Sequence, residues 1–261
     1  MTDTRTPREI RIDEQIAMFN VKQVVRITSQ QAMFVITQDG RVYSTGFNNY
    51  GTLGYFSPRH YDFGGYEHNF RLIESLVGYQ ISKITGQQER TLFLDRTEKK
   101  LFVAYPHEDT EGDACVDSKI PCGVVDVVCG RFQIATLTEN GLVFVSQSIT
   151  GFDAGSKWTR PQFTHLVIPA PVCSIVSGGS HFIAKDEHHQ IWGWGFNNKR
   201  QLGLLKYPEK EELLVSEPAM APELNTFEWD VKLFLRGTLL INKNTKCSIA
   251  FGDTDNVEWM H

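Results

Sequence analysis

The chain has 261 residues, enough for one large domain or two small ones. Its hydrophobic content of 41% is too high for a disordered chain, and no run approaches the roughly 18 uncharged apolar residues of a membrane span, which excludes an integral membrane protein. The net charge of −5 argues against binding of nucleic acid through phosphate contacts, because proteins that bind in this way are usually basic.

The N-terminal residues and the cysteines indicate a compartment. Residues 1–14 mix three arginines with four acidic residues and lack the apolar core of a signal peptide. The five cysteines are odd in number and widely spaced, without a C-x-x-C pair or a zinc spacing: Cys115, Cys122, Cys129, Cys173 and Cys247. We therefore expect reduced cysteines in the core of a cytoplasmic or nuclear protein.

The strongest signal along the chain is internal repetition. Gly46-Phe47-Asn48-Asn49 recurs as Gly195-Phe196-Asn197-Asn198, and Leu53-Gly54 recurs as Leu202-Gly203 at the same offset of 149 residues. Short runs of β-branched and aromatic residues precede both segments, and weaker copies of these runs occur at three other places in the chain. Five copies of one structural unit are therefore expected.

Each copy has the pattern of antiparallel strands divided by turn residues. Asp39-Gly40 and Asn140-Gly141 are expected to form hairpin turns, because glycine tolerates the positive φ that these turns need. Equivalent positions lie 57, 44, 48 and 59 residues apart, at Ser29, Gly86, Gly130, Gly178 and Gly237. This spacing suits one four-stranded propeller blade per copy, so we expect an all-β, closed β-propeller of about five blades as a single domain over residues 1–261.

The fifth copy leaves little room for a last strand before His261. The segment from Arg8 to Ile12 alternates in polarity and is a spare strand ahead of the first copy. We predict that this strand completes the last blade and closes the ring, because closure removes exposed sheet edges.

In these motifs the chain resembles the regulator of chromosome condensation repeat family. The blade of that family reads V-x-x-I-x-x-G-x-x-H-x-x-x-L and then D-G-x-V-Y-x-W-G-x-N-x-x-G-Q-L-G. The match is good in the copies that contain Gly46 and Gly195, and the other copies are degenerate. Members of the family usually have seven blades, so five would be a departure.

The motif residues have structural explanations. Tight turns and close strand packing account for the glycines Gly46, Gly54, Gly178, Gly195 and Gly203. Asn48 and Asn197 are expected to bond local backbone, and His181 to be a satisfied interior histidine. Trp192 and Trp194 share one face of a strand, where they either pack between blades or stack a base or a methylated cation.

The sequence shows no catalytic signature: it has no G-x-S-x-G elbow, no P-loop and no dinucleotide fingerprint. His188 and His189 are adjacent at an expected hairpin tip, and neighbouring side chains on a strand point to opposite faces, which disfavours a shared metal. We expect no catalytic residue, no metal and no cofactor.

The candidate binding residues lie in insertions between the repeats. The aromatic segment 55–70 has aromatics and arginine, which are enriched at interfaces, and its candidates are Tyr55, Phe56, Arg59, Tyr61, Phe63 and Tyr66. Burial of these rings against their own blade is the alternative. Lys157, Trp158 and Arg160 in segment 150–161 either contact phosphate or an acidic partner, or are structural. The proline-rich segment 204–224 is expected to be a solvated loop.

A propeller presents two faces built from loops, and function is located in the sites on those faces. We expect an intracellular module that binds a protein partner, without nucleic acid or membrane. The alternative implied by the resemblance is a guanine-nucleotide exchange factor for a Ran-like small GTPase. Such a factor opens the nucleotide site of its partner and needs no covalent chemistry.

Overall fold

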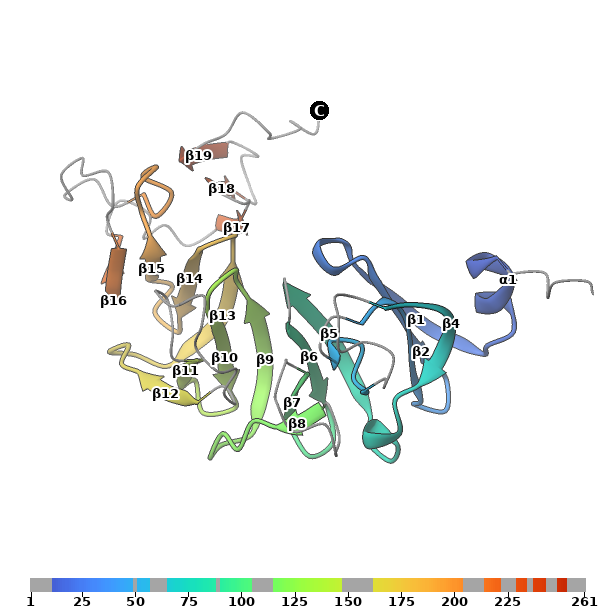
Figure 1. Cartoon of the computed structure of the whole chain (residues 1–261). Coiled ribbons are helices and arrows are strands. Elements are labelled where there is room, and N and C mark those ends of the chain that lie inside the picture. The colour runs from blue at the N-terminus through green and yellow to red at the C-terminus, as the bar shows by residue number, and fades with distance from the viewer. Residues whose placement is uncertain are drawn as a thin grey trace, which may run out of the picture.

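The computed structural model describes residues 11–48, 51–56, 65–87, 90–104, 115–146, 162–203, 214–221, 229–233, 237–242 and 248–252. Within these residues the strands form five antiparallel sheets, and each sheet corresponds to one copy of the sequence repeat (Figure 1). Four of the sheets have four strands and the fifth has three. The expected all-β class and the four-stranded blades are thus confirmed for four copies.

The strands follow one another in chain order within every sheet. The first sheet contains β1 (Val21–Ile27), β2 (Ala32–Thr37), β3 (Val42–Phe47) and β4 (Tyr66–Leu72). The second contains β5 (Ile81–Gln87), β6 (Arg90–Asp95), β7 (Leu101–Ala104) and β8 (Cys115–Asp117). The third contains β9 (Val124–Cys129), β10 (Ile134–Thr138), β11 (Val143–Ser146) and β12 (Phe163–Leu166). The fourth contains β13 (Val172–Ser177), β14 (His181–Asp186), β15 (Ile191–Phe196) and β16 (Leu214–Met220), and the fifth contains β17 (Trp229–Leu233), β18 (Gly237–Asn242) and β19 (Ser248–Gly252).

The first strands of consecutive sheets lie side by side. β1 contacts β5, β5 contacts β9, β9 contacts β13, and β13 contacts β17. Lys83 on β5 and Asp126 on β9 form an ion pair of 2.7 Å across one of these seams. The sheets fan outward from this line, so that β4, β8, β12 and β16 are outer strands (Figure 1). This radial arrangement is that of propeller blades.

Apolar clusters fill the space between consecutive sheets. Phe34 of the first sheet meets Phe93 of the second edge to face, with 5.6 Å between ring centroids. Phe182 and Trp194 stack at 5.4 Å in the cluster shared by the third and fourth sheets. Each fully buried side chain of this size stabilises the fold by about 1.5–3 kcal/mol, so the packing of sheet on sheet is the main source of stability.

The second and third strands of each four-stranded sheet are joined by short turns closed by a buried side chain. Gly40 and Gly141 have φ of +86° and +76°, as expected for the two hairpins. Asp186 accepts hydrogen bonds from the backbone N–H groups of His188 and Gln190. These side chains satisfy backbone donors within the turn, which holds the strand pair in register.

The N-terminal strand prediction is wrong for the part that the structure describes. Ile12–Ala17 is helix α1, not the end of a strand, and residues 1–10 lie outside the described part of the chain. Glutamate, glutamine and alanine in this segment are good helix formers, and Ile12 and Ile16 are four residues apart on one helix face. The amide of Gln15 donates to the carbonyl of His68 and accepts from the N–H of Phe70, both at 3.0 Å, so α1 docks on the outer strand β4.

Closure of the ring is not shown by the described residues. The fifth sheet ends with β19 as its third strand, and the described chain does not join it to the first sheet. The prediction of a solvated loop over residues 204–224 is also wrong in part, because Leu214–Met220 forms β16. Pro218 is tolerated there because β16 is an edge strand, where a missing N–H removes no ladder bond inside the sheet.

The glycines at the end of β3 and β15 test the blade alignment. Gly195 has φ of +100°, and a Cβ added there would lie 2.6 Å from the carbonyl oxygen of Ser180. We expect Gly195→Val to lower the free energy of unfolding by about 3 kcal/mol or more, measured by thermal melting. Gly46→Val is expected to behave alike, because its Cβ would lie 2.2 Å from the carbonyl oxygen of Gln31.

Gly78 is the matched control, since its φ is +96° and nothing lies within 4 Å of an added Cβ. Gly78→Val isolates the strain of the positive φ from the clash, and should cost roughly 1 kcal/mol. Equal destabilisation by Gly195→Val and Gly78→Val would contradict the close strand approach described here.

Docking of α1 on β4 gives a second stability prediction. Gln15→Leu removes both hydrogen bonds to β4 and leaves the N–H of Phe70 and the carbonyl of His68 without this partner. We expect a loss of about 1–3 kcal/mol in unfolding by urea. Glu14→Leu on the exposed side of the same helix is the control, expected within about 0.5 kcal/mol of wild type. If both variants matched wild type, α1 would not be docked in solution.

Candidate functional site

The two ends of the sheets differ in the connections they carry. The end that has the turns between second and third strands, such as the Asp39-Gly40 turn, is named the hairpin end. We call the opposite one the loop end. It has the turns between first and second strands and also the connections from third to fourth strands, because strand direction alternates within each sheet. In Figure 1 the loop end of β9 is the end at which its arrow points.

The predicted insertions all belong to the loop end. The start of segment 55–70 lies in the connection from β3 to β4, and its last five residues belong to β4 itself. Segment 150–161 lies in the connection from β11 to β12, and the start of segment 204–224 in that from β15 to β16. The sequence alone does not relate these insertions to one another. The strand order shows that the connections that contain them start at the same end of the sheets. Arg59, Tyr61, Phe63, Lys157, Trp158 and Arg160 themselves lie outside the described residues.

Tyr55 is a core residue and not a surface contact. Its side chain is 8% exposed and belongs to the apolar cluster between the first and second sheets. The guanidinium of Arg71 lies 4.3 Å from the centroid of the Tyr55 ring. Burial raises the pKa of Tyr55 to about 12, so its hydroxyl stays neutral at physiological pH. For this residue the alternative of burial against its own blade is the one the structure supports.

Tyr66 presents an aromatic surface at the start of β4. Its side chain is 37% exposed, and its ring contacts Phe47 at 5.2 Å and His68 at 4.8 Å between centroids. Phe56 is half-buried. Tyr66 is therefore the most exposed of the candidate residues in this segment that the structure describes, and a partner could contact its ring.

The asparagines of the repeat motif organise the turns that follow β3 and β15. The Asn48 side chain accepts from the N–H of Leu53 at 3.0 Å and donates to the carbonyl of Tyr55 at 2.9 Å. Asn197 accepts from the N–H of Leu202 at 2.9 Å. Gly54 and Gly203 have φ of +93° and +64° in these turns. The turns are thus fixed by their own side chains before any partner binds.

Buried polar side chains at the loop end connect consecutive sheets. Gln30 of the first sheet donates to the carbonyl of Arg90 in the second at 2.7 Å. Gln133 of the third sheet accepts from the indole N–H of Trp194 in the fourth at 3.0 Å. His181, which is fully buried, lies 3.0 Å from the hydroxyl of Thr238 in the fifth sheet. These contacts fix the sheets relative to one another where the loops leave them.

The tryptophans of β15 pack between sheets. Trp194 is fully buried and Trp192 is partly buried against the same cluster of the third and fourth sheets. The indole N–H of Trp192 donates to the carboxylate of Asp186 at 2.9 Å. Neither ring is placed as an open platform for a base or a methylated cation.

A surface that the sequence did not single out lies at the loop end of the third and fourth sheets. Arg131 and Phe132 come from the turn between β9 and β10, and Phe196 ends β15. The rings of Phe132 and Phe196 are 6.0 Å apart, and the Arg131 guanidinium carbon lies 5.2 Å from the Phe132 centroid. The two turns are more than sixty residues apart in sequence, so only the structure brings them together.

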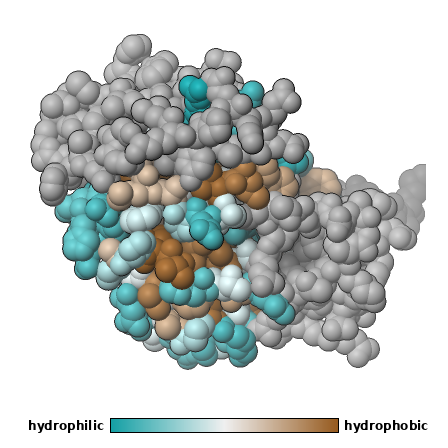
Figure 2. Space-filling model, turned by 90° about the vertical axis from the view of Figure 1, so that its left-hand side faces the viewer, coloured by the Kyte–Doolittle hydropathy of each residue, from teal (hydrophilic) through white to brown (hydrophobic). Residues whose placement is uncertain are grey.

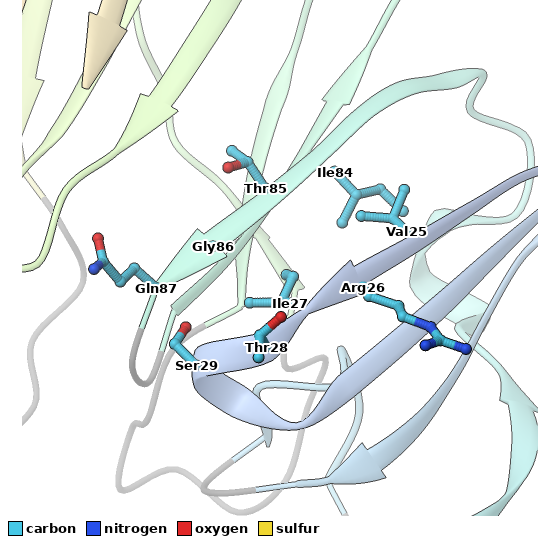
Figure 3. A pocket seen from close by; sticks show the side chains of 9 residues that line it. All are labelled: Val25, Arg26, Ile27, Thr28, Ser29, Ile84, Thr85, Gly86 and Gln87. Carbon is cyan, nitrogen blue, oxygen red and sulfur yellow. The ribbon is translucent and has the colours of Figure 1, made fainter. Parts of the chain in front are cut away.

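A groove of about 260 Å³ lies between β1 and β5 at the seam of the first two sheets (Figure 3). Val25, Ile27 and Ile84 lie between the two strands, and Thr28, Ser29 and Gln87 lie at the loop end of the groove. The groove therefore has apolar side chains between the strands and polar side chains at its loop end.

The hairpin end has a different electrostatic character. Ion pairs join charges of opposite sign there: Arg41–Asp39, Lys99–Glu139, Lys100–Glu98 and Lys119–Asp117. The side of the molecule where β12 and β16 lie shows apolar surface interrupted by hydrophilic residues (Figure 2). The hairpin end also has an aromatic pair beside a cation: the rings of Tyr79 and Phe102 are 4.6 Å apart, and the Lys100 ammonium lies 5.7 Å from the Tyr79 centroid.

The described ranges also bear on metal binding and on membrane insertion. These contain no group of three His, Cys, Asp or Glu residues placed to hold a metal ion. None of the helices described is long and apolar enough to cross a membrane.

Curated proteins of known sequence share similarity with much of this chain. No family model matches the chain. It is 24% identical over 183 residues to the E3 ubiquitin-protein ligase HERC2 of Homo sapiens, which covers 64% of this chain and 4% of that protein. It is 20% identical over 215 residues to Protein pim1 of Schizosaccharomyces pombe, which covers 74% of this chain and 40% of that protein. The chain spans less than half the length of these relatives.

Solved structures share the fold. Yeast RCC1 (Prp20) superposes with a TM-score of 0.67 at 17% identity, over 89% of this chain and 56% of that chain. Human WBSCR16 superposes with a TM-score of 0.62 at 20% identity, over 85% of this chain and 58% of that chain. The resemblance to the regulator of chromosome condensation repeat family is thus confirmed, with the β-propeller fold of its members.

The reactivity of the cysteines tests how the second sheet packs against the third. Cys115 and Cys129 are buried as expected, whereas Cys173 on β13 is exposed, which corrects its assignment to the core. Burial raises the pKa of the Cys129 thiol to about 11. Since the thiolate is the nucleophile, we expect iodoacetamide at pH 8 to modify Cys173 at least about 100-fold faster than Cys129 in the native protein.

Mass spectrometry of labelled peptides measures both rates in one sample. Unfolding in urea is the control, because it exposes both thiols and should bring the two rates close together. Equal rates in the native protein would contradict the packing of the second sheet against the third, where Cys129 lies.

Proposed function

We propose that this protein is an intracellular protein–protein interaction module, in the cytoplasm or nucleus, that binds its partner with the loop end of the propeller. The observation that carries the proposal is that every third-to-fourth strand connection of the four complete sheets leaves from this end. The buried side chains that join the sheets at the same end provide a rigid base for these connections. Binding residues concentrate on loops held by such a scaffold.

The proposal requires no covalent chemistry from this chain. A binding surface made of aromatic and cationic side chains recognises another protein by burial and charge. We therefore propose a binding protein and not an enzyme in the covalent sense.

A second candidate is guanine-nucleotide exchange for a Ran-like small GTPase. The observation that favours it is the likeness to yeast Prp20p, whose solved structure was described together with its binding properties to Gsp1p and histones. That protein shares 17% identity with this chain, which covers 56% of it, so the likeness supports the fold and leaves the activity as a proposal. Exchange factors act by stabilising the nucleotide-free GTPase and would also use a propeller face.

Affinity capture from native extract tests both candidates. The tagged chain is compared with a loop-end variant, Tyr61→Ser/Phe63→Ser/Tyr66→Ser, and with a control, Val77→Ser, at an exposed apolar residue of the hairpin end. Each is used with and without EDTA, which removes magnesium and leaves small GTPases free of nucleotide. We expect a partner that the loop-end variant loses by about tenfold and the control retains.

The outcomes separate the candidates. A partner captured equally with and without EDTA supports an interaction module. A small GTPase enriched only with EDTA supports nucleotide exchange, and release of a fluorescent nucleotide is then measured. A partner retained by the loop-end variant and lost by Val77→Ser would place the binding face at the hairpin end and overturn the proposal.

A further inference from the structure

We propose that the outer face of the first sheet, near the loop end, binds a β-sheet of a partner protein in the way that a preceding blade would. The surface, which we call the open face, consists of Val24, Arg26, Met33, Phe47 and Tyr66. This inference rests on the proposed function, because it identifies the kind of partner structure that one part of the loop end would recognise.

Strand pairing places these five residues on one side of the first sheet. Val24 and Arg26 alternate along β1, and Arg26 lies opposite Met33 on β2. Phe47 and Tyr66 lie opposite each other on β3 and β4, on the same side of the sheet as Met33. The Arg26 side chain points away from β5, so this side faces away from the second sheet (Figure 3).

The fourth residue of each first strand shows what this side packs against in later sheets. Val24, Ile84, Val127 and Ile175 hold this position in β1, β5, β9 and β13, each just after an irregularity of register. The last three are at most 6% exposed, and they belong to apolar clusters shared with the preceding sheet. In the described chain no sheet precedes the first one, and Val24 is 40% exposed.

The repeat at an offset of 149 residues relates Met33 and Phe47 to such a seam. Met33 corresponds to Phe182, which is 2% exposed in the cluster of the third and fourth sheets. Phe47 corresponds to Phe196, whose ring lies 6.0 Å from that of Phe132 in the first turn of the preceding sheet. Met33 and Phe47 are half-buried. The open face therefore has the side chains of one half of a seam between blades.

Arg26 adds a polar contact at a defined position of the open face. It is the sixth residue of β1, and the sixth residue of β13 is Ser177. The Ser177 hydroxyl donates to the carbonyl of Cys129 in the preceding sheet at 3.2 Å. A guanidinium reaches further than a hydroxyl and donates several hydrogen bonds. We therefore expect an oxygen acceptor, either a backbone carbonyl or a carboxylate, opposite Arg26 in the partner.

The N-terminal segment covers the other part of this side of the first sheet. Phe19 packs on Tyr43 at 4.6 Å and on Phe70 at 5.6 Å between ring centroids. Along β3 and β4 both of these residues lie nearer to the hairpin end than Phe47 and Tyr66 do. Tyr66 is 37% exposed. The open face is thus the part near the loop end, beyond the contacts of Phe19.

The fifth sheet is a poor match to the open face, whether it comes from the same chain or from a second copy. Val231 of β17 packs against the fourth sheet, so Asp230 and Lys232 lie on the other side of the strand, where both are exposed. In earlier sheets that side carries Val128 and Val176, which pack against the following sheet. Burying charged groups in place of valines is unfavourable, which favours a sheet from another protein.

The chemistry of the partner surface follows from these seams. It presents apolar side chains opposite Val24 and Met33, an aromatic side chain opposite Phe47, and the oxygen acceptor opposite Arg26. Buried aromatic and arginine side chains are the residues that most often dominate binding at protein interfaces.

Photocrosslinking of the full chain identifies what lies on the open face. p-Benzoylphenylalanine replaces Val24 in the test protein and Val77, an exposed apolar residue of the hairpin end, in the control. Both proteins are irradiated in native extract and also as purified samples, and mass spectrometry identifies the crosslinked peptides. In extract we expect position 24 to crosslink to one protein about tenfold more than position 77, through a peptide from a β-strand of that protein.

The protein identified in this way, once purified, is the probe for measurements of affinity. We expect Val24→Glu to weaken its binding about tenfold or more, and the control Val77→Glu to remain within about twofold of wild type. Arg26→Glu should also weaken binding, and Arg26→Lys, which keeps a donor, should retain more of the affinity. Matching thermal melts of Val24→Glu and wild type show that weaker binding is not caused by unfolding.

Several results would overturn the inference. Crosslinks from position 24 to its own chain or to a second copy, in the purified samples, would mean that this protein covers the open face itself. A crosslink no stronger than that of position 77, or one to a peptide outside a β-sheet, would also overturn it, as would wild-type affinity of Val24→Glu. A partner lost by the loop-end variant and retained by Val24→Glu would leave the proposed function standing, so the two failures are distinguishable.

Discussion

The structure depends on polar side chains that are buried between sheets at the loop end. The Trp194 indole would lose its partner in the core without Gln133, and the Thr238 hydroxyl bridges His181 to the carbonyl of Gln201. A buried polar group without a partner destabilises a fold by about 1–3 kcal/mol, so these contacts select one relative orientation of neighbouring sheets. Apolar packing alone is non-directional and would allow the sheets to slide.

Fixing the sheets in this way explains why the two ends of the molecule differ. The hairpin end is closed by short turns and exposed ion pairs, which add little to stability but keep this surface polar and balanced in charge. The loop end has the long connections on top of the bridging contacts. A partner that binds there meets a base that is already ordered, so less conformational entropy is lost on binding.

The sequence predicted the features that depend on local pattern. Repeats of apolar runs and the Asp39-Gly40 turn predicted sheets and hairpins, because strand period and turn chemistry are read over few residues. It failed at Ile12–Ala17, which docks on the outer strand β4, and at Leu214–Met220, which pairs with β15 as an outer strand itself, because both short segments take their structure from contact with another strand. The contact between the Phe132 and Phe196 rings escaped prediction for the same reason, since the turn after β9 and the end of β15 each bond to the turn between β13 and β14.

The position of α1 bears on how the first sheet is stabilised. Phe34 faces the second sheet, so Tyr43, on the neighbouring strand in register with Val35, points to the opposite face. Phe19, just after α1, packs on this Tyr43 ring at 4.6 Å. The N-terminal segment thus covers the part of this face of the first sheet that bears Tyr43. The corresponding face of each later sheet packs against the preceding blade. Burial of the Phe19 and Tyr43 rings removes apolar surface of the first sheet from water, and so adds to the stability that the packing of sheet on sheet gives the fold.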